Sequence, residues 1–226
     1  MNQSPLQADP AVLARRPLQY ATYLKSVHNW RDLPDEDGLE VAIAGRSNAG
    51  KSSAINAMAE QTRLARTSKT PGRTQQLVYF DLAPQRYLVD LPGYGYAKVP
   101  EALRDHWRKL IERYFRERQS LAGLVVVMDC RHPLKDFDRN MIGFAANRGL
   151  PCHVLLTKAD KLGRGAQSST LAKVRKELKS MVGERASAQT FSATARLGID
   201  DARGVIANWL GFEAPGAEPE IDQSAP

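Results

Sequence analysis

Apolar runs alternate with segments of helical spacing along most of the chain. The runs predict strands over residues 39–44, 76–82, 86–90, 124–128 and 153–156, with a sixth short strand ending near residue 191. Apolar residues at helical spacing predict helices over 51–59, 101–118, 136–148, 171–181 and 199–210. Strands that alternate with helices form βαβ units, so we expect a mostly parallel sheet with helices on both faces.

One pair of expected strands breaks this rule. Only residues 83–85 separate the strands over 76–82 and 86–90, which is enough for a hairpin but too short for a crossover. The pattern therefore predicts an α/β fold whose six-stranded, mostly parallel sheet carries one antiparallel edge strand.

The two ends of the chain lack this patterning. Residues 1–20 and 211–226 are rich in Pro, Gly, Ala and polar residues, so we expect a flexible N-terminal segment, a folded domain over 21–210 and a disordered acidic tail. No apolar run reaches the roughly 18 residues of a membrane span, and the N-terminus lacks the apolar core of a signal peptide. We expect a cytoplasmic protein without membrane contact.

Charge points to a polyanionic partner. The chain carries +7, and residues 211–226 hold four acids and no Lys or Arg, so removing their −4 leaves +11 on residues 1–210. Such a body attracts RNA, although solubility alone also explains it. The expected helix over 101–118 contributes basic residues to a solvated face, diluted there by four acids: Arg104, Arg108, Lys109, Arg113, Arg116 and Arg118.

Cysteine and histidine add no metal site. Cys130 and Cys152 adjoin apolar strands, which predicts buried, reduced thiols. The histidines share no metal-ligand spacing, so we expect surface or boundary positions for them: His28, His106, His132 and His153.

A phosphate-binding motif directly follows the first expected strand and directly precedes a helix. Its residues match G-x-x-x-x-G-K-[ST]: Gly45, Arg46, Ser47, Asn48, Ala49, Gly50, Lys51 and Ser52, with Ser53 next to them. Backbone N–H groups of such a loop cradle phosphates, Lys51 reaches the β and γ phosphates, and the Ser52 hydroxyl ligates Mg²⁺. The motif predicts a P-loop nucleotide-binding domain with Mg²⁺ as its cofactor.

A second loop follows the strand over 86–90 and contains Asp90, Leu91, Pro92 and Gly93. The Asp90 carboxylate can hold Mg²⁺ through water, and the Gly93 N–H can face the γ-phosphate. Alone, this pattern is better explained as a strand followed by a Pro-Gly turn. Its place after a P-loop favours the functional interpretation.

A third loop contains Thr157, Lys158, Ala159 and Asp160. The Asp160 carboxylate can accept two hydrogen bonds from guanine, which adenine does not offer, while the Lys158 stem can lie over the ring. The alternative is a helix cap at Asp160. Ser192, Ala193 and Thr194, after the last strand, can offer a backbone N–H to guanine O6.

The polar loop over 67–75 can close over the γ-phosphate. A hydroxyl there completes the Mg²⁺ shell in the GTP state, and Thr70 and Thr74 are both candidates that spacing does not separate.

Together, GRSNAGKSS, TPGRTQ, DLPGYGYAK, MDCRHP, TKAD and FSA closely resemble the EngB family of bacterial GTPases over residues 20–210. The resemblance implies a Ras-like P-loop GTPase domain that hydrolyses GTP through Lys51, Thr74 and Gly93. It selects Thr74 as a Mg²⁺ ligand beside Ser52, and implies further nucleotide contacts at Gly72, Arg73, Thr74, Gln75, Gln76, Phe191, Ser192 and Ala193. It also implies a role in maturation of the large ribosomal subunit or its rRNA, and in cell division and septation.

Two positions depart from the broader GTPase pattern. Thr157 replaces the usual Asn, which leaves fewer hydrogen bonds to the P-loop, and Tyr94 stands where many GTPases have a water-orienting Gln. We therefore expect slow intrinsic turnover. In the resembling group Asn48 is linked to a K⁺ ion that bridges the phosphates, so K⁺ is a second candidate cofactor.

Two other functions compete with a monomeric GTP/GDP switch. One is a nucleotide-regulated RNA-binding protein with vestigial hydrolysis, against which the complete set of phosphate and guanine loops argues. The other is a P-loop ATP-dependent kinase, which the guanine-selecting Asp160 disfavours.

Overall fold

A computed structural model describes the chain over residues 17–65, 76–93 and 101–212. Seven strands form one sheet in the order β1-β3-β4-β2-β5-β6-β7. The strands are β1 (Thr22–Val27), β2 (Leu39–Gly45), β3 (Leu77–Ala83), β4 (Arg86–Asp90), β5 (Leu121–Asp129), β6 (Cys152–Thr157) and β7 (Ala186–Thr190). The helices are α2 (Lys51–Ala59), α3 (Glu101–Glu117), α4 (Asp136–Arg148), α5 (Arg164–Val182) and α6 (Ile199–Trp209), with short 3₁₀ helices η2 (Pro17–Tyr20), η3 (Trp30–Asp32), η4 (Ala159–Lys161) and η5 (Gly183–Arg185).

The α/β class, the parallel core and the β3–β4 hairpin are confirmed, but the expected count of six strands is wrong. The missing strand is β1, which pairs antiparallel with β3 and forms the sheet edge. Its six residues, TYLKSV, lack clean alternation, since a bulge at Leu24 interrupts the register and Tyr23 and Leu24 are exposed. The sheet therefore has two antiparallel pairs, β1–β3 and β3–β4, rather than one, and β3, the strand that runs against the others, is not at the edge.

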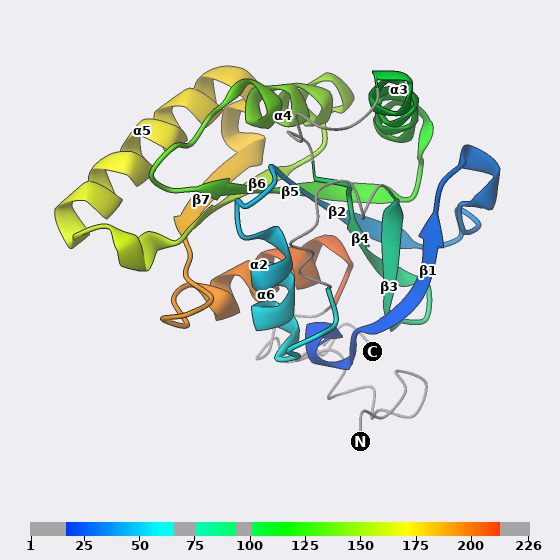
Figure 1. The fold of residues 1–226 in the computed structure, drawn as a ribbon, viewed down its shortest axis with the longest axis horizontal. Helices are drawn as coiled ribbons and strands as arrows, with labels where there is room; N and C mark the ends of the chain where they lie inside the picture. Colours follow the sequence, from blue (N-terminus) through cyan, green and yellow to red (C-terminus); the bar gives the residue numbers. More distant parts are fainter. Residues whose placement is uncertain (1–16, 66–75, 94–100, 213–226) are drawn as a thin grey trace, which may run out of the picture.

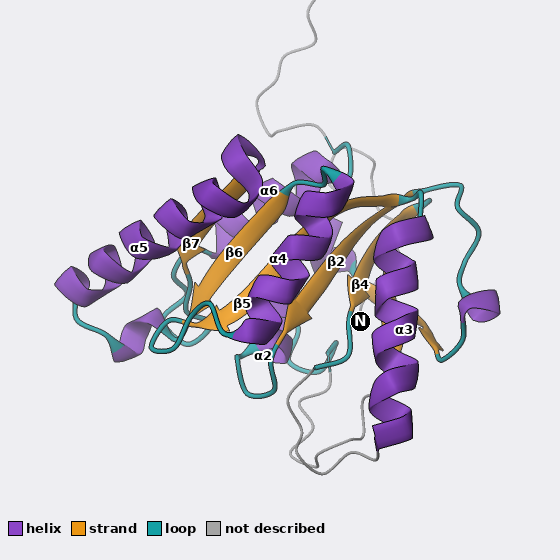
Figure 2. Ribbon diagram, turned by 90° about the horizontal axis from the view of Figure 1, so that it is seen from above, coloured by secondary structure: helices purple, strands orange, loops and turns teal. Residues whose placement is uncertain are grey.

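Helices cover both faces of the sheet. In Figure 1, α3, α4 and α5 lie above it, and α2 and α6 lie below. Figure 2, from above, shows α3, α4 and α5 side by side across the strands. Side chains alternate along each strand, so β5 sends Val126 to the core under α3 to α5 and Val125 to the core against α2 and α6.

Helix α5 begins at Arg164, seven residues before the expected start at residue 171. Its first turns are mostly exposed and polar, so they show no apolar periodicity, and the buried Val174 and Leu178 come later.

Near the N-terminus, Leu18 in η2 is 1% exposed, so the packed part of the molecule reaches back at least to this residue.

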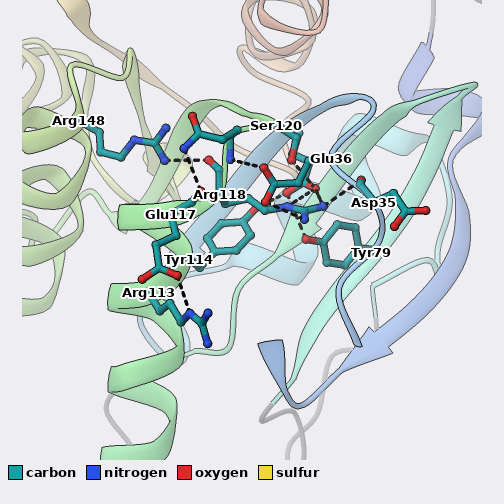
Figure 3. A network of polar contacts seen from close by, with 11 residues as sticks. Asp35, Glu36, Tyr79, Arg113, Tyr114, Glu117, Arg118, Ser120 and Arg148 are labelled. Carbon is teal, nitrogen blue, oxygen red and sulfur yellow. Dashed lines mark hydrogen bonds and ion pairs between the residues drawn. The ribbon is translucent and has the colours of Figure 1, made fainter. Parts of the chain in front are cut away.

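A buried polar network joins the amino end of β2 to the end of α3 (Figure 3). The Glu40 carboxylate accepts hydrogen bonds from the Tyr79, Tyr114 and Ser120 hydroxyls at 3.1, 2.7 and 3.0 Å, and from Arg118 Nε at 2.9 Å. Burial first, then the neighbouring Glu40 charge, raises the pKa of Tyr79 and Tyr114, so both phenols remain donors. The expected place of Arg118 on a solvated face is therefore wrong: this residue is 2% exposed.

The two thiols are buried as expected. His153 contradicts the expected surface or boundary position, because it is 4% exposed within β6. Within the described ranges, no helix is both long and apolar enough to cross a membrane.

Candidate functional site

The P-loop connects the end of β2 to the start of α2 through a tight turn. Gly50 has φ of 92°, a left-handed conformation that glycine adopts without strain, and Asn48 has φ of 62°, which Asn tolerates better than most residues. This geometry lets α2 begin at Lys51 with its N-terminus facing the loop, as an anion-binding turn requires.

Beside this turn, the Lys51 ammonium is paired with the Asp90 carboxylate at the end of β4. Burial raises the pKa of Asp90, and the Lys51 charge opposes that shift. Gly93 lies against the same loop, because a Cβ built there would be 3.6 Å from Gly45 O and 3.8 Å from Ser47 N. The structure thus brings together the two loops that the sequence assigns to phosphate and metal.

A pocket of about 220 Å³ adjoins the P-loop. Its walls come from the P-loop, the loop after β6 and the loop after β7: Gly50, Ser53, Thr157, Lys158, Asp160, Lys161, Phe191, Ser192, Ala193 and Thr194. These segments are far apart in the sequence, and they meet because they follow the carboxyl ends of three parallel strands of one sheet, β2, β6 and β7.

The Asp160 carboxylate is fixed at this pocket. Its Oδ1 accepts a hydrogen bond from Ser192 Oγ at 2.6 Å, and its Oδ2 lies 3.2 Å from Lys161 Nζ. The Ser192 bond, followed by the Lys161 bond and charge, lowers the pKa of Asp160 despite some opposing desolvation. The group is therefore an ionised acceptor at neutral pH, which is the state that a guanine donor pair needs.

Thr157 does tie its loop to the P-loop, although it replaces the usual Asn. Its hydroxyl contacts Ala49 O, and Met128 O lies 2.9 Å away. A hydroxyl has one hydrogen, so it serves these two carbonyls in turn or shares it between them.

Asp129 is a residue of the site that the sequence did not single out. It ends β5 and accepts a bond from Lys158 Nζ at 2.9 Å, while Lys158 Nζ also donates to Asn48 O at 2.6 Å. Arg131 binds the same carboxylate at 2.9 and 2.7 Å, and this contact first, then Lys158, holds the pKa of Asp129 well below its usual range. The signal was present in the MDCRHP motif.

The loop that was expected to close over the γ-phosphate lies outside the described residues. This applies to Thr70, Gly72, Arg73, Thr74 and Gln75, and also to Tyr94. Gln76 is described, and its side-chain amide contacts the His28 ring in the connection after β1.

The chemistry of the described groups fits a magnesium–phosphate site. Hard cations take oxygen ligands, and the site offers the Ser52 hydroxyl, one residue beyond Lys51 in α2, and the carboxylate of Asp90, which pairs with Lys51. The anionic oxygens of Asp90 lie beside the ammonium and helix N-terminus that attract phosphate. A Mg²⁺ ion held there would neutralise phosphate charge.

Fold and site together define a P-loop GTPase. The family model described as a 50S ribosome-binding GTPase matches residues 40–158. The probable GTP-binding protein EngB of Xanthomonas axonopodis pv. citri (strain 306) is 61% identical over 209 residues, which cover 92% of this chain and 98% of that protein. The chain belongs to the EngB family of GTP-binding proteins.

Other relatives agree. The probable GTP-binding protein EngB of Stenotrophomonas maltophilia (strain K279a) is 62% identical over 196 residues, covering 87% of this chain and 98% of that protein. A crystal structure of a probable GTP-binding protein EngB matches the fold with a TM-score of 0.61 at 19% identity, covering 76% of this chain and 98% of that one. Elongation factor SelB from Methanococcus maripaludis, in complex with the GTP analogue GppNHp, matches with a TM-score of 0.55 at 18% identity over 81% of this chain and 36% of its own.

Proposed function

We propose that this protein is a GTP-hydrolysing switch that assists assembly of the large ribosomal subunit in the cytoplasm and is needed for normal cell division and septation. The observation that carries the proposal is the meeting of a Lys51–Asp90 phosphate site with a pocket built around an ionised Asp160. The description of the matching family as ribosome-binding supports the choice of partner.

In this proposal Lys51, Thr74 and Gly93 act on the γ-phosphate. Mg²⁺ is held directly by Ser52 and Thr74, and by Asp90 through water. The position of Gly93 against Gly45 and Ser47 supports its part. Thr74 rests on the family resemblance.

Separate threonine variants test the switch residue. Thr74→Ala should weaken binding of a non-hydrolysable GTP analogue and spare GDP, since its hydroxyl is needed only in the GTP state. Thr70→Ala is the matched control and should leave both nucleotides unaffected. The opposite outcome, selective loss of the GTP analogue in Thr70→Ala, would assign the switch to Thr70.

The isolated monomer should hydrolyse GTP slowly, because no glutamine follows Gly93 to orient water. A stimulating arginine finger from a partner is worth about 10³ to 10⁵ in rate. K⁺ is a partial substitute near Asn48, so turnover should be faster in KCl than in NaCl, and Asn48→Ala should remove the difference. Equal turnover in both salts would rule out the K⁺ site.

The contact with a polyanionic particle has two candidate surfaces. On α3, Arg108 pairs with Asp105, and Arg113 and Arg116 pair with Glu117, so much of the positive charge is neutralised. On α5 the one acid is Glu177, which pairs with Arg139 of α4, while Arg164, Lys173 and Lys176 are exposed. The outer face of α5 is therefore the more basic surface, and we place the RNA contact there.

Sedimentation with purified large ribosomal particles tests partner and surface together. Binding should be tighter with the GTP analogue than with GDP, and it should fall as salt rises, because phosphate contacts release counterions. Lys173→Glu with Lys176→Glu should weaken binding more than Arg108→Glu with Arg113→Glu, with nucleotide affinity unchanged in both. A larger effect of Arg108→Glu with Arg113→Glu would mean that the RNA contact lies on α3 instead of α5.

The two competing functions give different results in simple assays. Nucleotide-dependent RNA binding without any phosphate release would indicate vestigial hydrolysis. Equal affinity for ATP and GTP would favour a kinase. Depletion of the protein in cells should cause accumulation of large-subunit precursors before septation fails, since assembly is the proposed direct role.

A further inference from the structure

His153 is a buried histidine that the proposed chemistry does not use. It lies in β6, and both ring nitrogens bond to side chains of the neighbouring strand β7. Nδ1 lies 2.7 Å from Ser187 Oγ, and Nε2 lies 2.8 Å from Gln189 Oε1. A fully buried imidazole with two satisfied nitrogens has one defined orientation.

The hydrogen-bond pattern fixes which nitrogen carries the proton. The amide nitrogen of Gln189 donates to Gly198 O at 2.6 Å, so its oxygen is the atom that faces His153. That oxygen can only accept, which requires a proton on His153 Nε2. Burial is the largest effect on the pKa of His153 and lowers it; Arg175 acts in the same direction, and the Gln189 bond and Asp201 oppose it. The ring is therefore neutral, and its Nδ1 accepts from Ser187.

Gly198 is the far end of the loop that lines the nucleotide pocket. The loop leaves β7 after Thr190, and a pair of bonds of 3.0 Å between Ser192 and Leu197 closes it. Gly198 has φ of 69°, and a Cβ there would lie 2.5 Å from both Thr190 O and the Gln189 amide nitrogen. The Gln189 side chain thus holds the end of the loop close to its start.

The same loop shapes the base end of the pocket. Ser192, Ala193 and Thr194 line it, and the Phe191 carbonyl accepts a bond of 3.1 Å from Ala159 N, next to Asp160. A shift of Gly198 would move these backbone groups against Asp160. The position of a backbone N–H relative to a base oxygen is sensitive to such small displacements.

We propose that His153 and Gln189 are positioning residues for base recognition: His153 orients the Gln189 amide, and this amide holds the pocket loop in register with Asp160. The inference rests on the proposed guanine pocket. Neither side chain lines that pocket, so both act through the loop.

The test measures discrimination between GDP and ADP, not stability alone. His153→Leu and Gln189→Leu should each lower the affinity ratio of GDP to ADP by roughly tenfold and speed GDP release, because ADP has no O6 to accept a hydrogen bond from a well-placed backbone N–H. His153→Gln keeps an amide donor near the place of Nε2 and should restore most of the ratio. The double variant His153→Leu/Gln189→Leu should lower the GDP to ADP ratio no further than the more strongly affected single variant, since the two residues act in series as one hydrogen-bonded relay.

Cys152→Ala is the matched control. Cys152 precedes His153 on the same strand and is fully buried, but it faces the opposite core, so the variant loosens β6 without touching the relay. It should lower stability and leave the GDP to ADP ratio unchanged. If His153→Leu and Gln189→Leu behave in the same way, the relay is only structural and the inference is wrong. A wild-type protein that does not prefer GDP would instead overturn the proposed function, and the relay's role with it.

Discussion

Two buried ion pairs lie at opposite ends of the sheet and differ in how completely they are bonded. At the amino end of β2, Glu40 is 0% exposed and is bonded through both oxygens to Arg118 and three hydroxyls. At the carboxyl ends of β2 and β4, Lys51 pairs with Asp90, whose pKa is raised by burial. The first pair is a closed structural network. The second brings a cation and a carboxylate to the place where phosphate and Mg²⁺ would join them.

The contrast shows what buried charge does in the two places. Removing two ions from water costs several kcal/mol each, which only excellent geometry and further hydrogen bonds offset. Glu40 obtains these bonds from its own chain. The Lys51–Asp90 pair would obtain them from a ligand. The cost of its desolvation would therefore be offset when nucleotide binds and not when the chain folds. Variants that break one pair at a time separate these two roles.

Breaking the closed network should have the largest effect on folding. Arg118→Met leaves the Glu40 charge buried without its counterion, so the free energy of unfolding should fall by about 3 to 5 kcal/mol. Urea unfolding at pH 7.5 measures this, and nucleotide affinity of the folded fraction should remain within a factor of three. Arg116→Met, two residues earlier in the last turn of α3, is the matched control: its side chain is 69% exposed, and an exposed ion pair contributes little. Similar losses of unfolding free energy in both variants would show that the buried Glu40–Arg118 pair stabilises the fold no more than an exposed ion pair does.

The sequence predicted the two pairs unequally, for a physical reason. Lys51 and Asp90 belong to two nucleotide-binding motifs, so motif spacing identified Lys51, and the place of Asp90 after the P-loop identified Asp90. Glu40 and Arg118 occur in segments whose pattern predicts a strand start and a solvated helix face, and only long-range packing brings them together. β1 escaped prediction because its bulge breaks alternation. His153 was misassigned because a lone polar residue in an apolar strand gives no sign of the partners that β7 supplies.

Opening the second pair should damage binding more than folding. Lys51→Ala removes the ammonium that faces the β and γ phosphates, and charged hydrogen bonds contribute about 1.5 to 3 kcal/mol, so both GDP and GTP affinities should fall roughly 10- to 150-fold. Titration with a fluorescent GDP and a fluorescent GTP analogue checks this. The free energy of unfolding without nucleotide should fall less than in Arg118→Met. A Lys51→Ala protein that unfolds as readily as Arg118→Met would make both pairs structural.

The base end of the site extends the comparison from phosphate to guanine. Asp160→Asn replaces an acceptor by a group that turns a donor toward the guanine donors, so GTP affinity should fall by roughly tenfold or more and xanthine nucleotide affinity should rise. Competition between GTP and XTP measures the exchange. Ser192 should still contact position 160, so the fold should be retained. An unchanged preference for GTP would remove Asp160 as the guanine selector.

Asp138 is a third buried carboxylate. Unlike Glu40 it is bonded through only one of its oxygens in the described part of the chain, and unlike Asp90 it has no ion pair with Lys51. It stands in the first turn of α4 and is 1% exposed. Its Oδ2 accepts a bond of 2.9 Å from Lys135 N, and its Oδ1 has no hydrogen-bond partner within the described part of the chain. Burial raises the pKa of Asp138 to about 6, although the Lys135 backbone bond and the charges of Arg46 and Lys135 oppose the shift.

This raised pKa gives the smallest of the expected effects and fixes its sign. The folded protein holds the Asp138 proton up to about pH 6, whereas the unfolded chain releases it near 3.8, so stability falls as pH rises between these values and the penalty persists above them. Asp138→Asn keeps an oxygen for Lys135 N and carries no charge, so it should be more stable than wild type at pH 7.5 and no more stable at pH 4. Urea unfolding across this range measures the difference. Asp136→Asn, at an exposed position in the same turn, should show no such gain, because it only removes a favourable charge from the helix N-terminus. A difference between Asp138→Asn and wild type that is constant from pH 4 to 8 would mean that Asp138 is ionised throughout, and that its bond to Lys135 N already offsets its burial.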